Sequence, residues 1–149
     1  MKANKILVPV DFSESSDAAL DWATVLARDT GATLLIIHVE TVPLTTGGGE
    51  YIYAIPEPAT QELLERLHKV VPRDSSIPIV HRLLAGDPAE AILRAAQSEG
   101  VDMIVMGTHG RRGITRLLMG SVAEAIVRRA ECPVLILKHT SKVPAEAGA

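Results

Sequence analysis

The chain has 149 residues, of which 47% are hydrophobic and 22% charged, and its formal net charge is −3. These proportions favour one globular domain over a disordered chain, and the acidic balance excludes a general nucleic-acid binder, so we expect no nucleic-acid partner. No apolar run approaches the roughly 20 residues of a membrane span and no signal peptide is evident, so we expect no membrane contact and a cytoplasmic location.

The first part of the chain alternates between strand and helix patterns. Lys5–Val10 is a β-branched run that predicts the first strand. The run Ser13–Ser16 follows and offers hydroxyls that can cap a helix, and the apolar spacing after it predicts a helix that stops near Gly31. Thr33–Val39 is nearly all apolar and predicts a second strand that is covered on both faces.

Residues 42–56 interrupt this alternation. They contain two prolines and the run Gly47–Gly49, and they predict a loop that is long for a compact domain. Two interpretations are open. The segment is either a mobile surface insertion or a flap over a ligand, with Tyr51 and Tyr53 as candidate contacts.

The alternation resumes at Pro58, which suits the first turn of a helix whose apolar stripe extends to Val70 and Val71. Asp87 and Pro88 predict the N-cap and first position of the next helix, which Gly100 should end. The remaining predicted elements are strands over Ile77–Leu84, Asp102–Met106 and Pro133–Lys138 and a helix over Val122–Ala130.

Strands that alternate with helices predict an α/β domain, which we place at residues 1–140, with a flexible tail at 141–149. The expected architecture is a doubly wound, Rossmann-like, five-stranded parallel sheet in the order 3-2-1-4-5, with helices on both faces. In that order the first and fourth strands are neighbours at the switch point, where ligands bind outside the carboxyl ends of the strands.

A glycine-punctuated basic segment, Gly107–Ser121, follows the fourth predicted strand and precedes the last helix. Glycines let the backbone pass close to a ligand, and the first N–H groups of a helix lack partners within the helix. Together they predict an anion site, and phosphate is the anion that we expect there. The lysine of a P-loop and the dinucleotide fingerprint are both absent.

Several polar residues near this crevice have two interpretations each. Asp11 can accept hydrogen bonds from ribose hydroxyls or an adenine amine, or it can cap the first helix. Arg111 and Arg112 are candidate phosphate contacts or part of a solvated basic turn. His109 is a candidate phosphate contact as well, and its alternatives are a hydrogen-bonding spacer or a catalytic base. The other histidines show no metal-ligand spacing, and no protein metal site is predicted.

Cys132 is the single cysteine, so an intrachain disulfide is excluded. It follows Glu131, at the point where a helix gives way to a strand. We interpret it as a buried, inert thiol rather than a reactive one, because acidic surroundings disfavour a thiolate.

The spacing Gly107-x2-Gly110-x9-Gly120-Ser121 resembles the G-x2-G-x9-G-[S/T] signature of the ATP-binding branch of the universal stress protein family. The run Ile6–Asp11 resembles the first strand of that family. Leu35–Val39 is similar to its second strand and Cys132–Ile136 to its last, so the likeness covers nearly the whole chain.

The resemblance implies an adenine nucleotide as ligand: ATP, or ADP or AMP, accompanied by Mg²⁺ or Mn²⁺. It implies ribose and adenine contacts for the strand ends and phosphate contacts for the glycine loop and helix start. The nucleotide-binding residues implied are Pro9, Asp11, Val39, Met106, Gly107, Gly110, Gly120, Ser121 and Val122.

The family likeness also implies a homodimer formed through the fifth strand, Val134–Leu137, whose apolar edge would otherwise be exposed. The leading hypothesis is therefore an ATP-binding regulatory protein of the stress response. A slow ATPase or phosphoryl-transfer enzyme is the second hypothesis, with Asp11 or His109 as the available bases. An interaction module that does not depend on nucleotide is the third.

Overall fold

The computed structural model describes residues 2–41, 43–45, 51–53, 57–108 and 119–138, with the backbone alone described at 43–45, 51–53 and 57–58. The strands are β1 (Lys5–Pro9), β2 (Thr33–Glu40), β3 (Pro43–Thr45), β4 (Tyr51–Tyr53), β5 (Ile79–Ala85), β6 (Met103–Gly107) and β7 (Val134–Leu137). The helices are α1 (Glu14–Thr30), α2 (Glu57–His68), α3 (Pro88–Ser98) and α4 (Ser121–Arg129).

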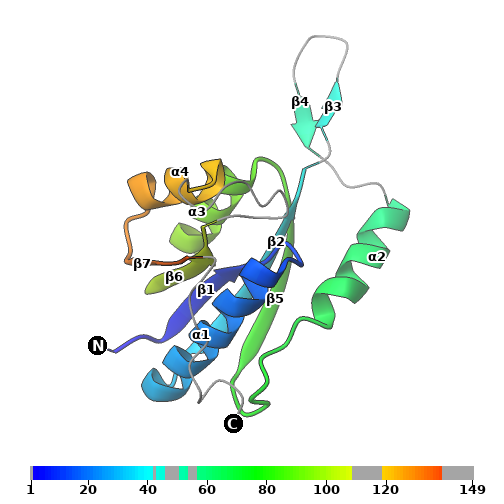
Figure 1. Ribbon diagram of the computed structural model, residues 1–149. Helices are drawn as coiled ribbons and strands as arrows, with labels where there is room; N and C mark the ends of the chain where they lie inside the picture. Colours follow the sequence, from blue (N-terminus) through cyan, green and yellow to red (C-terminus); the bar gives the residue numbers. More distant parts are fainter. Residues whose placement is uncertain (1, 42, 46–50, 54–56, 109–118, 139–149) are drawn as a thin grey trace.

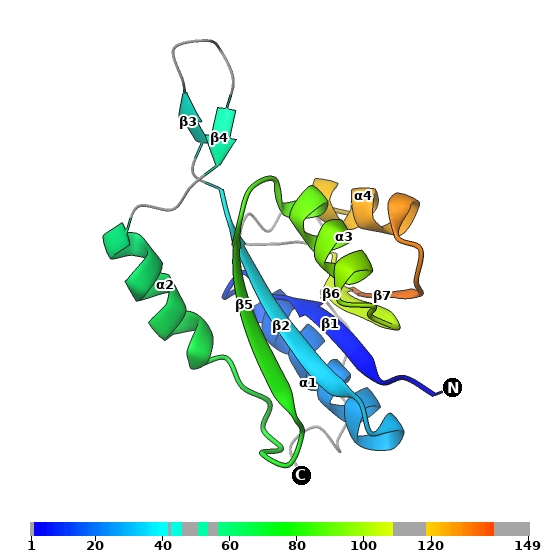
Figure 2. The ribbon, with the colours of Figure 1, turned by 180° about the vertical axis from the view of Figure 1, so that it is seen from behind.

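The central sheet has five strands in the order β5-β2-β1-β6-β7, and every pairing within it is parallel. Without the β3–β4 hairpin this is the predicted order 3-2-1-4-5, so the predicted fold class is confirmed. α1 and α2 cover one face of the sheet and α3 and α4 cover the other (Figures 1 and 2).

The two faces of the sheet bury separate apolar clusters because neighbouring strand residues point to opposite sides. On β2, Leu34 and Ile36 pack with residues of α1 and α2, whereas Leu35 and Ile37 pack with residues of α3 and α4. All four side chains are at most 1% exposed. A strand buried on both faces explains the nearly continuous apolar sequence of β2.

The predicted boundaries of α1 and α3 are confirmed. Ser13 is the N-cap of α1, and Gly31 ends that helix in the left-handed conformation, with φ of 76°. Asp87 is the N-cap of α3, and its side chain accepts a hydrogen bond from the Glu90 N–H at 3.0 Å. Pro88 is the first residue of α3, where its missing N–H costs nothing.

The predicted extent of α2 is wrong, because the helix ends at His68 and does not reach Val71. Its end is marked by the Val70 N–H, which donates to the Leu67 carbonyl three residues earlier, at 2.9 Å. Val71 precedes Pro72, and a residue before proline is pushed out of the helical region. As a result Val70 packs against the core, while Val71 is half exposed.

The expectation of an unbroken loop over residues 42–56 is also wrong. β3 and β4 pair antiparallel, with Leu44 opposite Ile52, and form a two-stranded hairpin that projects beyond the sheet (Figure 1). The glycine run between two short β-prone stretches is a hairpin pattern that the sequence interpretation missed. The side chains of Tyr51 and Tyr53 are not among the parts of the chain that the structure describes, so the proposed flap contacts stay predictions.

The strand boundaries differ from those predicted by one or two residues at several ends. The largest shift is at β5, which begins at Ile79 and not at Ile77. Pro78 has no N–H to donate, although its carbonyl accepts from Leu34 at 2.9 Å. The predicted tail, 141–149, lies outside the described residues.

Candidate functional site

Three predicted site residues lie at the carboxyl ends of three adjacent strands. Pro9 ends β1, Val39 is the penultimate residue of β2, and Met106 precedes the last residue of β6. β1 stands between β2 and β6, and it pairs with β6 through Leu7 and Ile104. Continuing that parallel register by two residues places Pro9 opposite Met106. The strand order therefore brings these residues to one edge of the sheet, at the switch point.

The turn between β1 and α1 holds Asp11 in a defined orientation. Oδ1 of Asp11 accepts hydrogen bonds from the Ser13 N–H, at 3.1 Å, and from the Ser13 hydroxyl. Ser13 in turn caps α1, since its Oγ accepts from the Ser16 N–H at 3.3 Å. The alternative that Asp11 caps the helix is therefore wrong. Among the described residues its other oxygen, Oδ2, accepts no hydrogen bond, and Asp11 is only partly buried.

The end of β6 and the start of α4 lie next to each other. The Gly120 N–H donates to the Thr108 carbonyl at 2.7 Å, and the Thr108 N–H donates to the Leu137 carbonyl at 3.1 Å. These two bonds close the base of the segment that leaves β6 at Gly107. The two ends of the predicted glycine segment therefore lie next to each other at the carboxyl end of β6, the same end of the sheet at which β1 leads into Asp11.

The start of α4 differs from the prediction by one residue. Gly120 is the N-cap, with extended backbone angles and no side-chain hydrogen bond, and Ser121 is the first helical residue. Ser121 therefore does not cap the helix, because the cap position needs the extended backbone that Gly120 adopts. The Ser121 side chain is exposed, and Val122 is partly buried.

Of the three helix starts whose caps are described, α1 and α3 each have a side chain that satisfies a free N–H group, and α4 has none. The first N–H groups of α4 have no acceptor within the helix and carry the positive end of the helix dipole. This start can therefore accept an anion. The other candidate phosphate contacts, His109, Gly110, Arg111 and Arg112, lie outside the described residues and stay predictions.

A buried histidine beside the Asp11 turn was missed as a site residue. His38 of β2 is 1% exposed, and its Nδ1 lies 2.8 Å from the Val10 carbonyl oxygen. Its Nε2 lies 2.9 Å from Oε2 of Glu40. The signal in the sequence was a polar residue inside an otherwise apolar strand. The sequence interpretation tested His38 only for metal-ligand spacing, which it lacks.

Neither a metal cluster nor a membrane helix is found in the described part of the chain. No group of three or more His, Cys, Asp or Glu side chains there could hold a metal ion. Within the same residues, no helix is long and apolar enough to cross a membrane.

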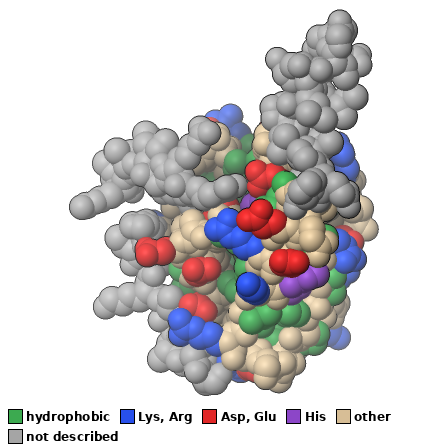
Figure 3. Space-filling model, turned by 90° about the vertical axis from the view of Figure 1, so that its right-hand side faces the viewer, with side chains coloured by type: hydrophobic (Ala, Val, Ile, Leu, Met, Phe, Trp, Pro, Cys, Tyr) green, Lys and Arg blue, Asp and Glu red, His purple; other side chains and the backbone are tan. Residues whose placement is uncertain are grey.

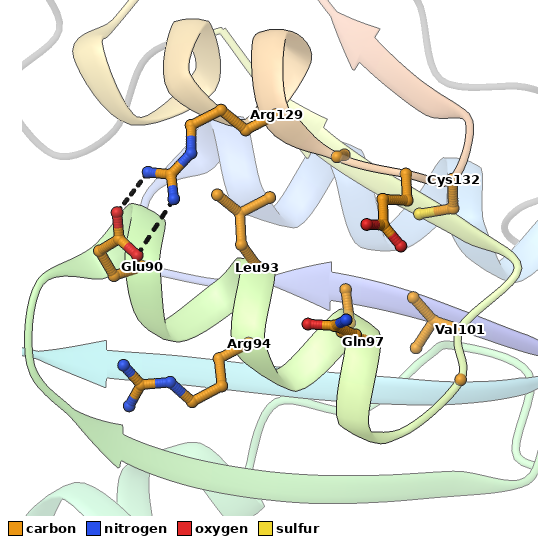
Figure 4. Close-up of a pocket in the computed structure, with 11 residues that line it drawn as sticks. Glu90, Leu93, Arg94, Gln97, Val101, Arg129 and Cys132 are labelled. Atoms are coloured by element: carbon orange, nitrogen blue, oxygen red, sulfur yellow. Dashed lines mark hydrogen bonds and ion pairs between the residues drawn. The ribbon is translucent and has the colours of Figure 1, made fainter.

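A groove of about 490 Å³ lies elsewhere, between α3 and α4 (Figure 4). Leu93 and Val101 contribute apolar surface, and Glu90 and Arg129 form an ion pair across one end. Cys132 lies at the other end, where burial and the nearby Asp102 carboxylate raise the pKa of its thiol. None of the predicted nucleotide residues lines this groove. The raised pKa agrees with the predicted inert thiol, but the prediction that this thiol is buried is wrong, because Cys132 is only partly buried where it lines the groove.

Comparison with known proteins agrees with this architecture. The model of the universal stress protein family matches residues 2–138. The chain belongs to the universal stress protein family. It is 35% identical to the universal stress protein MJ0531 of Methanocaldococcus jannaschii over 143 residues, covering 93% of this chain and 84% of that protein. It is 38% identical to a universal stress protein of Thermus aquaticus, covering 89% and 97% of the two chains.

Solved structures of universal stress proteins share the fold. One is the protein from Archaeoglobus fulgidus in complex with dAMP, with a TM-score of 0.66 and 26% identity. The match covers 93% of this chain and all of that one. A universal stress protein similar to this chain therefore binds an adenine nucleotide.

Proposed function

We propose that this universal stress protein binds an adenine nucleotide at the β1–α1 turn and the start of α4, and that it acts as a cytoplasmic regulatory protein of the stress response. The observation that carries the proposal is the uncapped start of α4, tied by Gly120 to the end of β6. The dAMP complex of the Archaeoglobus fulgidus relative supports the choice of ligand. ATP is the nucleotide we propose, with ADP and AMP as its shorter forms.

The ribose and the adenine of the nucleotide each have partners at the ends of the strands. The free oxygen of Asp11 accepts hydrogen bonds from ribose hydroxyls, and the backbone of Val39 addresses the adenine. Pro9, Met106 and Gly107 flank the ribose at the strand ends.

The phosphate oxygens accept hydrogen bonds from the backbone N–H groups of Ser121 and Val122, from the Ser121 hydroxyl, and from the backbone N–H groups of the glycines at both ends of the loop. Charge-assisted hydrogen bonds contribute about 1.5–3 kcal/mol each. After the costs of association, a few such bonds suit a micromolar dissociation constant, about −8 kcal/mol.

The residues present fit a metal that arrives with the nucleotide. Mg²⁺ prefers to keep several waters and to bind through substrate phosphates and one or two carboxylates. Asp11 is a carboxylate at the carboxyl ends of these strands, and one carboxylate ligand is compatible with that mode. We therefore propose Mg²⁺ or Mn²⁺ as a companion of the triphosphate, and the titration below is repeated with excess chelator to test it.

A homodimer through β7 is part of the same proposal. β7 is an edge strand of the sheet, and Val134, Leu135 and Ile136 are only partly buried. Pairing with β7 of a second copy would satisfy its open backbone groups and cover these side chains. Sedimentation equilibrium at tens of micromolar protein should show twice the monomer mass, and a monomer at that concentration would contradict the dimer.

The test of nucleotide binding is calorimetric titration of ATP into the wild type and two variants. Gly120→Val puts a side chain where a phosphate must approach the backbone, and Asp11→Ala removes the ribose acceptor. Both should weaken binding at least about tenfold, roughly the loss of one charged hydrogen bond. Asp87→Ala, at the cap of α3, is the matched control and should bind as the wild type does. No heat from wild-type protein at tens of micromolar would overturn the proposal.

A further inference from the structure

The hydrogen bonds of His38 require a proton that neutral imidazole and an ionised carboxylate do not supply. The Val10 carbonyl oxygen can only accept, so Nδ1 must carry the hydrogen of the 2.8 Å bond. Neutral imidazole has one N–H, so Nε2 is then a bare acceptor facing Oε2 of Glu40 at 2.9 Å. Two lone pairs do not approach so closely without a proton between them. In this geometry the His38–Glu40 pair therefore holds one extra proton.

The groups that surround the His38 imidazole are mostly apolar. The Phe12 ring packs against it in a tilted orientation, with centroids 4.5 Å apart, and His38 is next to the apolar Leu83 of β5 in the sheet register. The Arg66 guanidinium lies 4.1 Å from the centroid of the Phe12 ring. Arg66 belongs to α2, and the face of the molecule on which α2 lies carries acidic and basic side chains side by side (Figure 3). Among the described residues, Glu40 is thus the charged group in direct contact with the ring, and Arg66 is separated from the ring by Phe12.

The turn that His38 holds is also conformationally special. Phe12 has φ of 66°, in the left-handed region that a non-glycine residue rarely adopts. The surrounding contacts must supply the stability that this backbone costs. Three such contacts are the His38 bond to Val10, the packing of the His38 ring against Phe12 and the cation–π contact of Arg66 with Phe12, and all of them involve residues 10–12.

These residues are continuous with the proposed nucleotide site. Val10 lies between Pro9 and Asp11, and Val39 lies between His38 and Glu40. A change in the His38–Glu40 pair therefore reaches both the ribose acceptor and the adenine contact through one peptide unit.

We propose that His38 and Glu40 are positioning residues of the nucleotide site: the proton they share holds the β1–α1 turn in its binding conformation, so nucleotide binding is linked to proton uptake. The linkage rests on the proposed function. When the pH rises and the proton leaves, one of the two His38 contacts must break. The turn then loses support, and the affinity for nucleotide falls.

Glu40→Gln is the decisive variant. The amide that replaces the carboxylate can donate an N–H to the bare Nε2 of neutral His38, which keeps both contacts without the extra proton. A linked proton changes an affinity by up to about tenfold per pH unit. Between pH 6.0 and pH 8.5 we expect the dissociation constant of ATP to rise at least about threefold more for wild type than for Glu40→Gln. Ionisation of ATP itself cancels in this ratio. His68→Gln, an exposed histidine of α2, is the control and should follow the wild type.

A second measurement needs no nucleotide. In the free protein, imidazole ¹⁵N chemical shifts at pH 6.0 report which nitrogens of His38 carry protons. We expect the wild type to show a shared or full proton at Nε2 that is absent in Glu40→Gln. A bare Nε2 in the wild type at pH 6.0, with the fold intact, would overturn the inference whether or not ATP binds, and it remains decisive if Glu40→Gln does not fold.

The outcomes separate the two proposals. Binding of ATP with the same pH dependence in wild type and Glu40→Gln overturns the linkage and leaves the proposed function standing. Failure of the wild type to bind ATP at every pH overturns the proposed function and the linkage together.

Discussion

Gly107, the last residue of β6, lies so close to α1 that a Cβ atom at this position would come within 1.9 Å of Oγ of Ser15. The Ser15 carbonyl oxygen would lie 3.3 Å from it, closer than most Cβ contacts allow. Gly107 therefore lets the first turn of α1 pack against the end of β6. This packing role stands beside the ribose contact proposed for the same residue.

Gly107→Ala should lower the free energy of unfolding by about 1–3 kcal/mol, the usual cost of overpacking. Most of the clash is with the Ser15 hydroxyl, so Ser15→Ala in the same chain should recover a large part of the loss. Urea unfolding of the two single variants and the double variant gives the coupling energy. Additive losses, or a Gly107→Ala protein as stable as the wild type, would refute the close packing.

Ser13→Ala should affect both stability and nucleotide binding. Ser13 caps α1 and its hydroxyl bonds to Oδ1 of Asp11, so the variant loses a helix cap and one of the bonds that orient the carboxylate. Loss of a cap costs about 0.5–2 kcal/mol. Asp87→Ala should lose a similar amount at α3 while it keeps its affinity for ATP. Thermal unfolding and calorimetry on both variants test this, and equal ATP affinity in the two would contradict a role for Ser13 in orienting Asp11.

Acid should destabilise the protein partly through Asp74. Hydrogen bonds from the Ser76 hydroxyl and N–H, and then from Arg28, lower the pKa of this carboxyl to about 2. Because its pKa is lower in the folded than in the unfolded chain, Asp74 adds stability above about pH 4, and this contribution is lost as the pH falls toward 2.

The comparison is between Asp74→Asn and Asp29→Asn, which changes an exposed carboxylate in the last turn of α1. Unfolding midpoints measured from pH 5 to pH 2 should fall less steeply for Asp74→Asn than for the wild type. Asp29→Asn should follow the wild-type curve. Parallel curves for wild type and Asp74→Asn would show that this carboxyl does not contribute.

Cys132 should react slowly with a thiol reagent such as dithionitrobenzoate at pH 7. Partial burial and the Asp102 carboxylate raise the pKa of its thiol, so little reactive thiolate is present. Since the chain has one cysteine, the same protein in urea serves as the control and should react faster. Asp102→Asn should increase the folded-state rate modestly. Equal rates in the folded and unfolded protein would show that the groove leaves this thiol open.

Local residue patterns were sufficient for the framework. Asp87 begins α3 and Gly31 ends α1 where predicted, and α1 begins at one of the predicted capping serines, because capping depends on a few neighbouring residues. The apolar runs located the strands, and their alternation with helices predicted the sheet order that the structure shows. The missed features were local as well. Pro72 follows the end of α2, and the pairing of β3 with β4 corresponds to a hairpin pattern in the sequence that the prediction of a loop overlooked.

By itself the sequence determined the α/β framework, the family and the residues proposed for the nucleotide, since all of these depend on short-range pattern and spacing. Only the tertiary structure decided what surrounds them. The close approach of Gly107 to Ser15 and the contact of His38 with the Val10 carbonyl join residues of different elements. Such contacts depend on how parallel strands and their helices come together in space, and side-chain periodicity along the chain carries no record of them.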